Sequence, residues 1–248
     1  MIRPGIDDRF ISLEVDMLML SATDEWQKAH PGAAIGVLEV SGVDNTRPAA
    51  SLENRKRETE ERLRVSFGGF SRQDFLMHPV MSAYEKYYKR FDKTYHVLLQ
   101  AESIVHKGKN LPTVSPLVDV NFAAEVETWI LTAGHDVELL QEPVFFAVTR
   151  PGDVMVQMNG AAKDLRAGDM AMKDTGGVCC TILYGQDNRS PISARTSHVL
   201  YVAYAPAGVP AELVETQLRR IEENIRLFSP AAVKEQRRLL RAGEGSSA

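Results

Sequence analysis

The chain has 248 residues and a formal net charge of −4, with 29 basic residues against 33 acidic ones. Hydrophobic residues make up 44% and charged residues 25%, which is the balance of an ordinary folded protein and not of a disordered one. The charge excludes a globally basic nucleic-acid binder, and no apolar run reaches the roughly 18 residues that span a bilayer. Acidic residues within the first twenty exclude a secretory signal, so we expect a cytoplasmic protein with no membrane partner.

The first part of the chain is expected to contain two strands around a short helix. Alternation in residues 9–20 predicts a strand, and Asp24 is placed to cap the helix. The apolar run 33–43 predicts a buried strand. We therefore take residues 1–23 as an N-terminal strand extension and residues 24–228 as one α+β domain.

Residues 50–108 are predicted to form a helical insertion in this domain. The stretch 50–66 is almost entirely charged and lacks Pro and Gly, which indicates a long solvated helix with a thin apolar stripe. Ser71 and Pro79 are typical of positions where helices begin, and Gly108 of a position where one ends.

The second half of the chain is expected to be rich in strands. A long helix is predicted over 116–134, followed by short β-branched runs between 137 and 205 that are separated by turns. Apolar residues at 4-3-4-3 spacing predict an amphipathic helix over 210–228. The charged segment 229–248 is expected to be a mobile tail.

The two cysteines, Cys179 and Cys180, are adjacent and lie in one apolar run. Adjacent cysteines can close only a strained ring, and their neighbours supply neither a base nor a positive charge. We therefore expect buried, reduced thiols on opposite faces of a strand. The six histidines show no metal-ligand spacing, so no metal site is expected.

Basic and aromatic residues are interleaved in one predicted helix and just after it. The basic residues are Lys86, Lys89, Arg90 and Lys93, and the aromatic ones are Tyr84, Tyr87, Tyr88, Phe91 and Tyr95. Such interleaving can bind phosphates and stack bases, which makes Lys86, Lys89 and Arg90 candidate RNA contacts. At helical spacing the same aromatic residues can instead belong to the core, and both interpretations stay open.

Two polar features are candidates for chemistry. His135 and Asp136, at the predicted end of the long helix, are either a proton-transfer pair or a cap on that helix. The loop 187–190 is either a contact for a ribose or ammonium group or a solvated hairpin loop. Spacing alone does not decide between these alternatives.

Four segments, 35–47, 107–136, 168–190 and 196–204, resemble one family in their order and spacing. They resemble the B3/B4 domain of the bacterial phenylalanyl-tRNA synthetase β subunit, and most of all its free-standing relatives. The resemblance extends over residues 24–228. It implies an α+β fold with a mixed, barrel-like sheet core packed by helices, no metal, no organic cofactor, and the aminoacylated 3′ end of a tRNA as partner, with no role for DNA.

In the synthetase this domain hydrolyses a wrongly attached amino acid, because one pocket discriminates poorly between similar side chains. The resemblance therefore implies hydrolysis of an aminoacyl ester in trans, with backbone N–H groups at Gly176 and Gly177 facing the oxyanion and Asp187 holding the amino group or the water. The terminal ribose hydroxyl can assist as an acid or base. The residues expected to contact the substrate are Asp119, Asn121, His135, Asp174, Cys180, Arg189 and Ser190.

Departures from the family pattern keep a second interpretation open. Ala133 stands where the synthetase domain has a His, and Phe122 stands where free-standing relatives have an Asn. The synthetase domain removes tyrosine, and because of these departures that specificity is not carried over to this chain. The alternative is a non-catalytic module that binds RNA or a small ligand. The sequence does not indicate the tRNA, the amino acid or the oligomeric state.

Overall fold

Four strands form an antiparallel sheet in the order β11-β2-β10-β3 around two central strands that are rich in apolar residues. The two central strands, β2 (Ala34–Ser41) and β10 (Val199–Ala205), are buried along their whole length. Strands that are covered on both faces show continuous apolar runs in place of alternation. The outer strands are β3 (Thr132–Asp136) and β11 (Val233–Arg241).

A second sheet has five strands in the order β1-β4-β7-β8-β9, and its β1–β4 pair is parallel whereas the other pairs are antiparallel. Its strands are β1 (Leu20–Ala22), β4 (Val144–Val148), β7 (Met170–Asp174), β8 (Gly177–Thr181) and β9 (Gly185–Gln186), and β5 (Val154–Val156) and β6 (Ala162–Asp164) form a separate hairpin. The expected α+β class with a mixed sheet is confirmed. The barrel is not: within residues 17–46 and 49–243, which the computed structural model describes, the sheets do not close.

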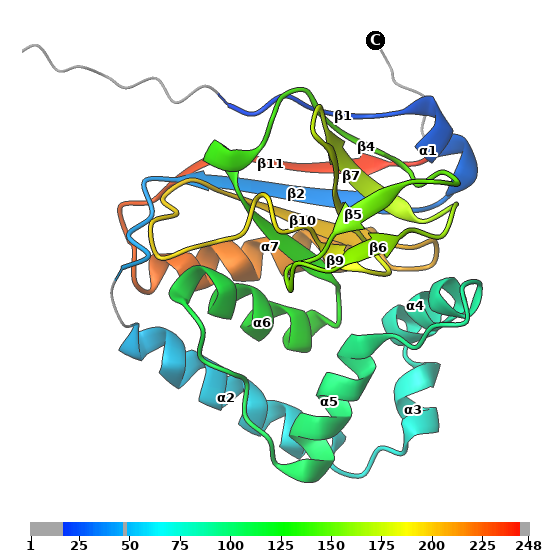
Figure 1. Ribbon diagram of the computed structural model, residues 1–248. Helices are drawn as coiled ribbons and strands as arrows, with labels where there is room; N and C mark the ends of the chain where they lie inside the picture. The colour runs from blue at the N-terminus through cyan, green and yellow to red at the C-terminus, as the bar shows by residue number, and fades with distance from the viewer. Residues whose placement is uncertain (1–16, 47–48, 244–248) are drawn as a thin grey trace, which may run out of the picture.

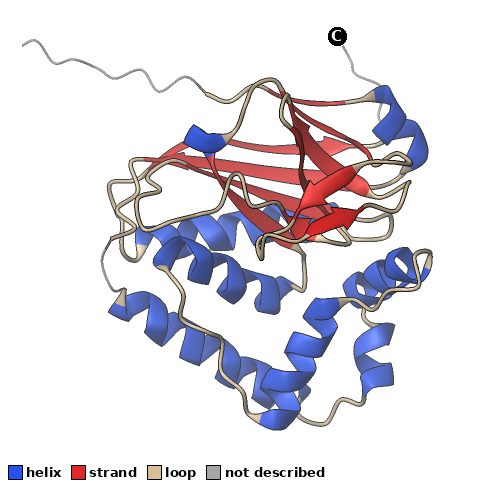
Figure 2. Ribbon diagram, in the orientation of Figure 1, coloured by secondary structure: helices blue, strands red, loops and turns tan. Residues whose placement is uncertain are grey.

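The four longest helices lie below the sheets in two layers, whereas α1 lies beside the sheets (Figures 1 and 2). The upper layer holds α6 (Pro116–Thr128) and α7 (Ala211–Arg226), and the lower one holds α2 (Ala50–Phe67) and α5 (His96–Lys107). The shorter helices are α1 (Asp24–Ala29), α3 (Arg72–Met77), α4 (Pro79–Lys89) and a 3₁₀ turn at Val137–Leu139.

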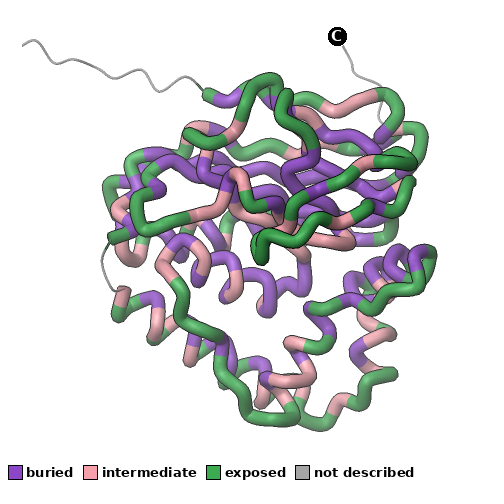
Figure 3. The backbone as a smooth tube through the Cα atoms, in the orientation of Figure 1, coloured by how far each residue is buried: buried purple, intermediate pink, exposed green. Residues whose placement is uncertain are grey.

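The predicted amphipathic helix α7 packs its apolar stripe against the four-stranded sheet. Val214, Leu218 and Ile221 are fully buried, as the 4-3-4-3 spacing predicts. Gly36 on β2 makes the close approach possible, because a Cβ there would lie 2.6 Å from Val214 Cγ1. Buried positions run continuously from the sheets into this layer (Figure 3).

The aromatic residues of α4 belong to the same core. The rings of Tyr84 and Tyr95 stack with their centroids 4.1 Å apart. The hydroxyl of Tyr84 donates to the Tyr204 carbonyl on β10, and that of Tyr88 donates to the Ile182 carbonyl at 2.5 Å. These two hydroxyl bonds tie the helical insertion to β10 and to the end of β8.

The helix predicted over 116–134 ends early, at Thr128. Trp129 adopts a left-handed conformation with φ of 60°, and its N–H donates to the Glu125 carbonyl at 2.7 Å. The chain then turns back as β3 and pairs with β10. His135 and Asp136 are therefore strand residues, and the interpretation of this pair as a helix cap is wrong.

The expected mobile tail is wrong for residues 233–241, which form the edge strand β11 along β2. The strand tolerates its charges because most of its side chains face solvent, whereas Gln236 is buried and donates to Glu39 Oε2 at 2.5 Å. Of the strand predicted over 9–20, residues 9–16 lie outside the described residues; in 17–20 only Leu20 belongs to a strand, as the first residue of β1. No helix in the described part of the chain is both long and apolar enough to cross a membrane.

The predicted solvated helix, α2, has an inner face that carries charge. Lys56 and Glu60 are completely buried, together with the apolar Leu52. Lys56 Nζ lies 2.9 Å from Asp119 Oδ2 on α6, and Glu60 Oε1 accepts from the Leu111 N–H at 2.6 Å. The two helix layers are therefore joined by buried polar contacts where the sequence predicted only a thin apolar stripe.

Candidate active site

A cavity of about 590 Å³ opens between α6, β3 and the segment that joins β8 to β9. Its wall is mainly apolar and aromatic, with Leu117 and Phe122 from α6 and Tyr201 and Tyr204 from β10. A hollow of this size with a few polar groups is the usual setting for a small ligand or for part of a larger one.

Two polar side chains from α6 line this cavity, Asn121 and Glu125. They are four residues apart and therefore lie on one face of the helix. The Asn121 amide donates to the Thr132 carbonyl at 2.8 Å, and Glu125 Oε2 accepts from the Thr132 N–H at 3.1 Å. Together they satisfy the outer edge of β3 and fix the strand against α6.

Asn121 has a further hydrogen-bond acceptor that these bonds leave unused, and Glu125 has a carboxyl whose pKa is shifted by burial. The Asn121 Oδ1 atom is buried and has no partner among the described residues. Glu125 is only 5% exposed, and burial raises the pKa of its carboxyl to about 8, although the bond from the Thr132 N–H acts in the opposite direction. A buried acid with a pKa near neutrality beside a free acceptor is the combination that active sites use.

The cysteines are on opposite faces of β8, as predicted. Cys180 lines the cavity, whereas Cys179 accepts a contact from Arg189 Nη2 at 3.4 Å on the other side. Both are free and buried. Burial raises the pKa of Cys180 to about 12 and that of Cys179 as well, so both stay protonated thiols and neither is an activated nucleophile.

The sequence-predicted residues Asp174, Asp187 and Arg189 do meet, but they bind one another. Arg189 Nη1 lies 3.0 Å from Asp174 Oδ1, and Arg189 Nε lies 2.6 Å from Asp187 Oδ2. Asp187 is 1% exposed, and burial raises its pKa despite the neighbouring guanidinium. None of the three lines the cavity. Their roles in catalysis and binding stay predictions.

His135 and Ser190 extend this buried network. His135 Nδ1 lies 2.8 Å from Ser190 Oγ, and Ser190 Oγ donates to Asp187 Oδ1 at 3.3 Å. Gln186 Nε2 lies 3.2 Å from the same ring nitrogen and donates to the Ser190 carbonyl at 2.7 Å. Burial lowers the pKa of His135 to about 3, so the ring is neutral at physiological pH.

Gly176 lies in the exposed turn between β7 and β8, and Gly177 is the exposed first residue of β8; neither lines the cavity. A Cβ on Gly176 would come within 2.2 Å of Arg189 Nη1, and Gly177 has a φ of 124°. The close approach that Gly176 permits in this structure is therefore to Arg189. Whether these N–H groups also face an oxyanion stays a prediction.

Asp119 holds the helical layers together. Besides its ion pair with Lys56, its Oδ1 accepts from the Val114 N–H at 2.9 Å. Lys56 also donates to the Pro112 carbonyl at 2.8 Å, so one buried ion pair fixes the loop before α6. Asp119 does not line the 590 Å³ cavity.

The α4 aromatics are buried at 4% exposure or less, so they do not form a base-stacking platform. Lys86, Lys89 and Arg90 are exposed on the outer face of the helix and just beyond its end. Lys89 pairs with Glu85 at 3.0 Å, and the Arg90 guanidinium lies over the Tyr87 ring at 5.2 Å. Their contact with RNA stays a prediction.

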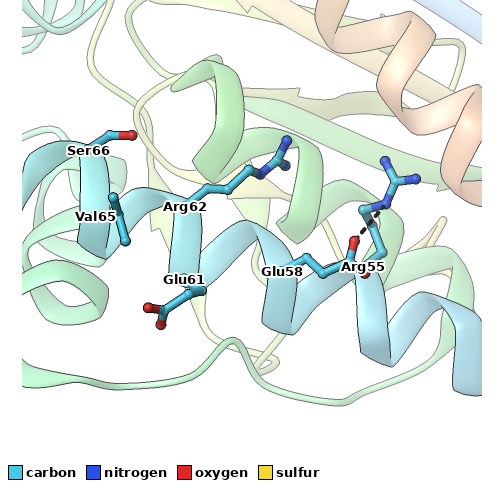
Figure 4. Close-up of a pocket in the computed structure, with 6 residues that line it drawn as sticks. All are labelled: Arg55, Glu58, Glu61, Arg62, Val65 and Ser66. Atoms are coloured by element: carbon cyan, nitrogen blue, oxygen red, sulfur yellow. Dashed lines mark ion pairs between the residues drawn. The ribbon is translucent and has the colours of Figure 1, made fainter.

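A hollow of about 690 Å³ lies on the outer surface of α2 (Figure 4). One helix supplies all of its lining residues, which are Arg55, Glu58, Glu61, Arg62, Val65 and Ser66. The side chains spread around the helix and do not converge, and Arg55 contacts Glu58 at 3.9 Å. It is a surface depression without the features of a binding site. No group of three or more potential metal ligands is found in the described part of the chain.

No family model matches the chain, and no curated protein matches it either. Among solved structures it is similar to the crystal structure of an N-terminal fragment of the phenylalanyl-tRNA synthetase β subunit from Pyrococcus horikoshii, with 7% identity and a TM-score of 0.44. The similarity covers 85% of this chain and 49% of that one, so the chain spans about half the length of the fragment. At this level the similarity assigns no role to any residue.

The sequence analysis singled out Asn121 and Cys180, which do line the cavity, and missed Glu125. A signal was present, because Glu125 is the lone charge on a helix face that also carries Asn121 and is otherwise apolar. Its raised pKa arises from tertiary burial, which spacing does not reveal.

Proposed function

We propose that the chain hydrolyses the ester between an amino acid and the 3′ end of a tRNA, with the amino-acid side chain held in the 590 Å³ cavity. The observation that carries the proposal is the buried Glu125 carboxyl, whose pKa burial raises to about 8, on the cavity wall beside the free Asn121 Oδ1. The family resemblance of residues 24–228 supports this choice of substrate class.

The proposed chemistry needs little from the protein, because an aminoacyl ester is already reactive. Asn121 Oδ1 accepts a hydrogen bond from the substrate ammonium group, and that positive charge favours ionisation of Glu125. The carboxylate takes a proton from a water molecule as the water oxygen bonds to the ester carbonyl carbon. The bond from this carbon to the ribose oxygen then breaks, and Glu125 gives the proton to that oxygen, which leaves as the ribose hydroxyl.

This proposal makes Glu125 the base that activates the water, whereas the resemblance had implied that Asp187 holds the amino group or the water. Asp187 is held by Arg189 at 2.6 Å and lies outside the cavity wall, whereas Glu125 is on it. A candidate base must be able to reach the water it activates. Asp187 contributes indirectly in this scheme, because its contacts hold the loop that follows β9.

The second candidate is a module that binds a small ligand without chemistry. It is favoured by the bonds that Asn121 and Glu125 already make to Thr132, since these bonds alone give both residues a structural purpose. Both candidate functions place the ligand in the cavity, but only the first includes hydrolysis of that ligand.

Deacylation of a panel of mischarged tRNAs tests the proposal. We expect at least one pair to lose its amino acid faster than spontaneously, and Glu125→Gln to slow this reaction by roughly 10²-fold or more, the usual contribution of a general base. Glu127→Gln is the matched control, because Glu127 lies on the same helix but pairs with Arg220 at 3.1 Å outside the cavity. If no tRNA is deacylated while amino-acid derivatives still raise the melting temperature, the binding module is correct.

A further inference from the structure

Two lysines from distant parts of the chain approach one ring at the cavity wall. The Nζ atoms of Lys93 and Lys163 each lie 5.4 Å from the centroid of the Tyr184 ring. The two ammonium groups are therefore at most twice that distance apart. Tyr184 itself lines the 590 Å³ cavity. We call these three residues the lysine rim.

The backbone that carries Lys93 is firmly held. It lies in the turn after α4, where Asp92 has a φ of 52° and the Lys93 N–H donates to the Tyr88 carbonyl at 3.1 Å. Tyr95, two residues later, is buried and donates to the Trp129 carbonyl at 2.9 Å. Only the side chain of Lys93 is free to adjust.

Lys163 and Tyr184 are held by a second set of contacts. Lys163 lies on β6, in the β5–β6 hairpin. Gln157, in the turn of that hairpin, donates to the Tyr184 carbonyl at 3.3 Å, and the Tyr184 N–H donates to Thr181 Oγ1 at 3.0 Å. The backbone that carries the rim is thus held in place before any ligand arrives, which lowers the entropic cost of binding.

Neither rim lysine has an ion-pair partner among residues 17–46 and 49–243. The neighbouring Asp92 contacts Arg166 at 3.5 Å. Asp164 follows Lys163 on β6, and successive residues of a strand point to opposite faces. Two cations near one ring repel each other, and an anion between them removes this repulsion. The chain as a whole is acidic, so this local excess of positive charge stands out.

We propose that the lysine rim binds the backbone phosphate of a nucleotide whose acylated end enters the cavity. The inference rests on the proposed function and names its RNA contact. The two lysines act as point charges on one phosphate or on two adjacent ones. The rim lysines lie over Tyr184, a ring of the cavity wall, whereas the Arg90 guanidinium lies over Tyr87, which does not line the cavity.

The test uses two hydrolysis-resistant probes that carry alanyl, leucyl, phenylalanyl or tyrosyl groups through a 3′-amide. One probe is the acylated adenosine, which has no phosphate, and the other is an acylated trinucleotide. We expect the best trinucleotide probe to bind the wild-type chain at least 10-fold more tightly than its adenosine counterpart. The Lys93→Gln/Lys163→Gln double variant should lose that advantage and bind the adenosine probe unchanged.

Salt dependence provides a second readout. For single strands, the slope of log K against log salt falls by about 0.7 for each phosphate neutralised, so the double variant should lose about 0.7 from the slope of the trinucleotide probe if the lysines bind one phosphate and about 1.4 if they bind two. Lys107→Gln, an exposed lysine at the end of α5, is the matched control and should change neither value. Melting curves confirm that the variants are folded.

Each outcome decides the inference. If the double variant keeps the full advantage of the trinucleotide, or if phosphates add nothing to wild-type affinity, the rim is not a phosphate site, while the cavity proposal stands on the adenosine probe. If neither probe binds, both the rim and the cavity proposals are wrong. If the phosphate advantage depends on the lysines but no ester is hydrolysed, the rim stands and the catalytic proposal fails.

Discussion

Replacing Glu125 by Gln removes a buried carboxyl whose pKa burial raises from 4.5 to about 8. At pH values below the pKa of Glu125 in the unfolded chain, the carboxyl is protonated in both the folded and the unfolded chain. In that range it has no effect on how stability varies with pH. As the pH rises, the unfolded chain ionises first, so the wild type loses stability until the folded pKa is passed. At roughly 1.4 kcal/mol per pKa unit, the whole loss is about 5 kcal/mol, as an upper figure.

Glutamine has nearly the same shape, keeps an oxygen for the Thr132 N–H and does not titrate. The free energy of unfolding of the Glu125→Gln variant, minus that of the wild type, should therefore rise by roughly 1.4 kcal/mol per pH unit between about pH 5 and pH 8 and then level off. Urea titrations at pH 5, 6, 7, 8 and 9 measure this difference. Parallel stability curves for the two proteins would show that Glu125 titrates normally and would remove the physical basis for its role as a base.

Three further predictions test other parts of the account. Gly176→Ala places a Cβ 2.2 Å from Arg189 Nη1, so it should displace the Arg189 side chain and lower the free energy of unfolding by about 1–3 kcal/mol. An unchanged denaturation midpoint would contradict this prediction. Both thiols should be inert to Ellman's reagent in the native state and react only on unfolding, because Cys179 and Cys180 are buried with raised pKa values; a fast reaction of the folded chain refutes it. Reversing the charges of Lys86, Lys89 and Arg90 together should weaken tRNA binding and flatten its salt dependence in a gel-shift assay; unchanged binding removes α4 as an RNA contact.

The elements with a strong local pattern could be predicted from the sequence. Helix α7 follows the spacing of Val214, Leu218 and Ile221, and the helix boundaries at Ser71, Pro79 and Gly108 follow the chemistry of capping. In each case the local preference and the tertiary environment favour the same structure.

The elements that were missed depend on tertiary contacts. A tryptophan in a left-handed conformation ends α6, which no propensity scale indicates, and this change of direction makes a strand of residues 132–136. The charged strand β11 is stable because β2 offers it an edge. Pattern alone assigned both segments to other structures.

Part of the candidate site could likewise be predicted from the sequence, and part of it could not. The sequence predicted that residues between 174 and 190 act together, and they do meet, but Arg189 pairs with Asp174 and Asp187 instead of facing the cavity. Asn121 was identified, whereas its helix neighbour Glu125 was not. Burial sets the chemistry of Glu125, and burial is a property of the folded chain.

The most direct test of the proposed function is the single-turnover rate of deacylation of a mischarged tRNA by wild type, Glu125→Gln and Glu127→Gln between pH 6 and pH 9. The account predicts a wild-type rate above spontaneous hydrolysis that rises with pH as Glu125 ionises, a Glu125→Gln rate lower by roughly 10²-fold or more, and no effect of Glu127→Gln. A Glu125→Gln rate equal to that of the wild type at every pH would contradict it.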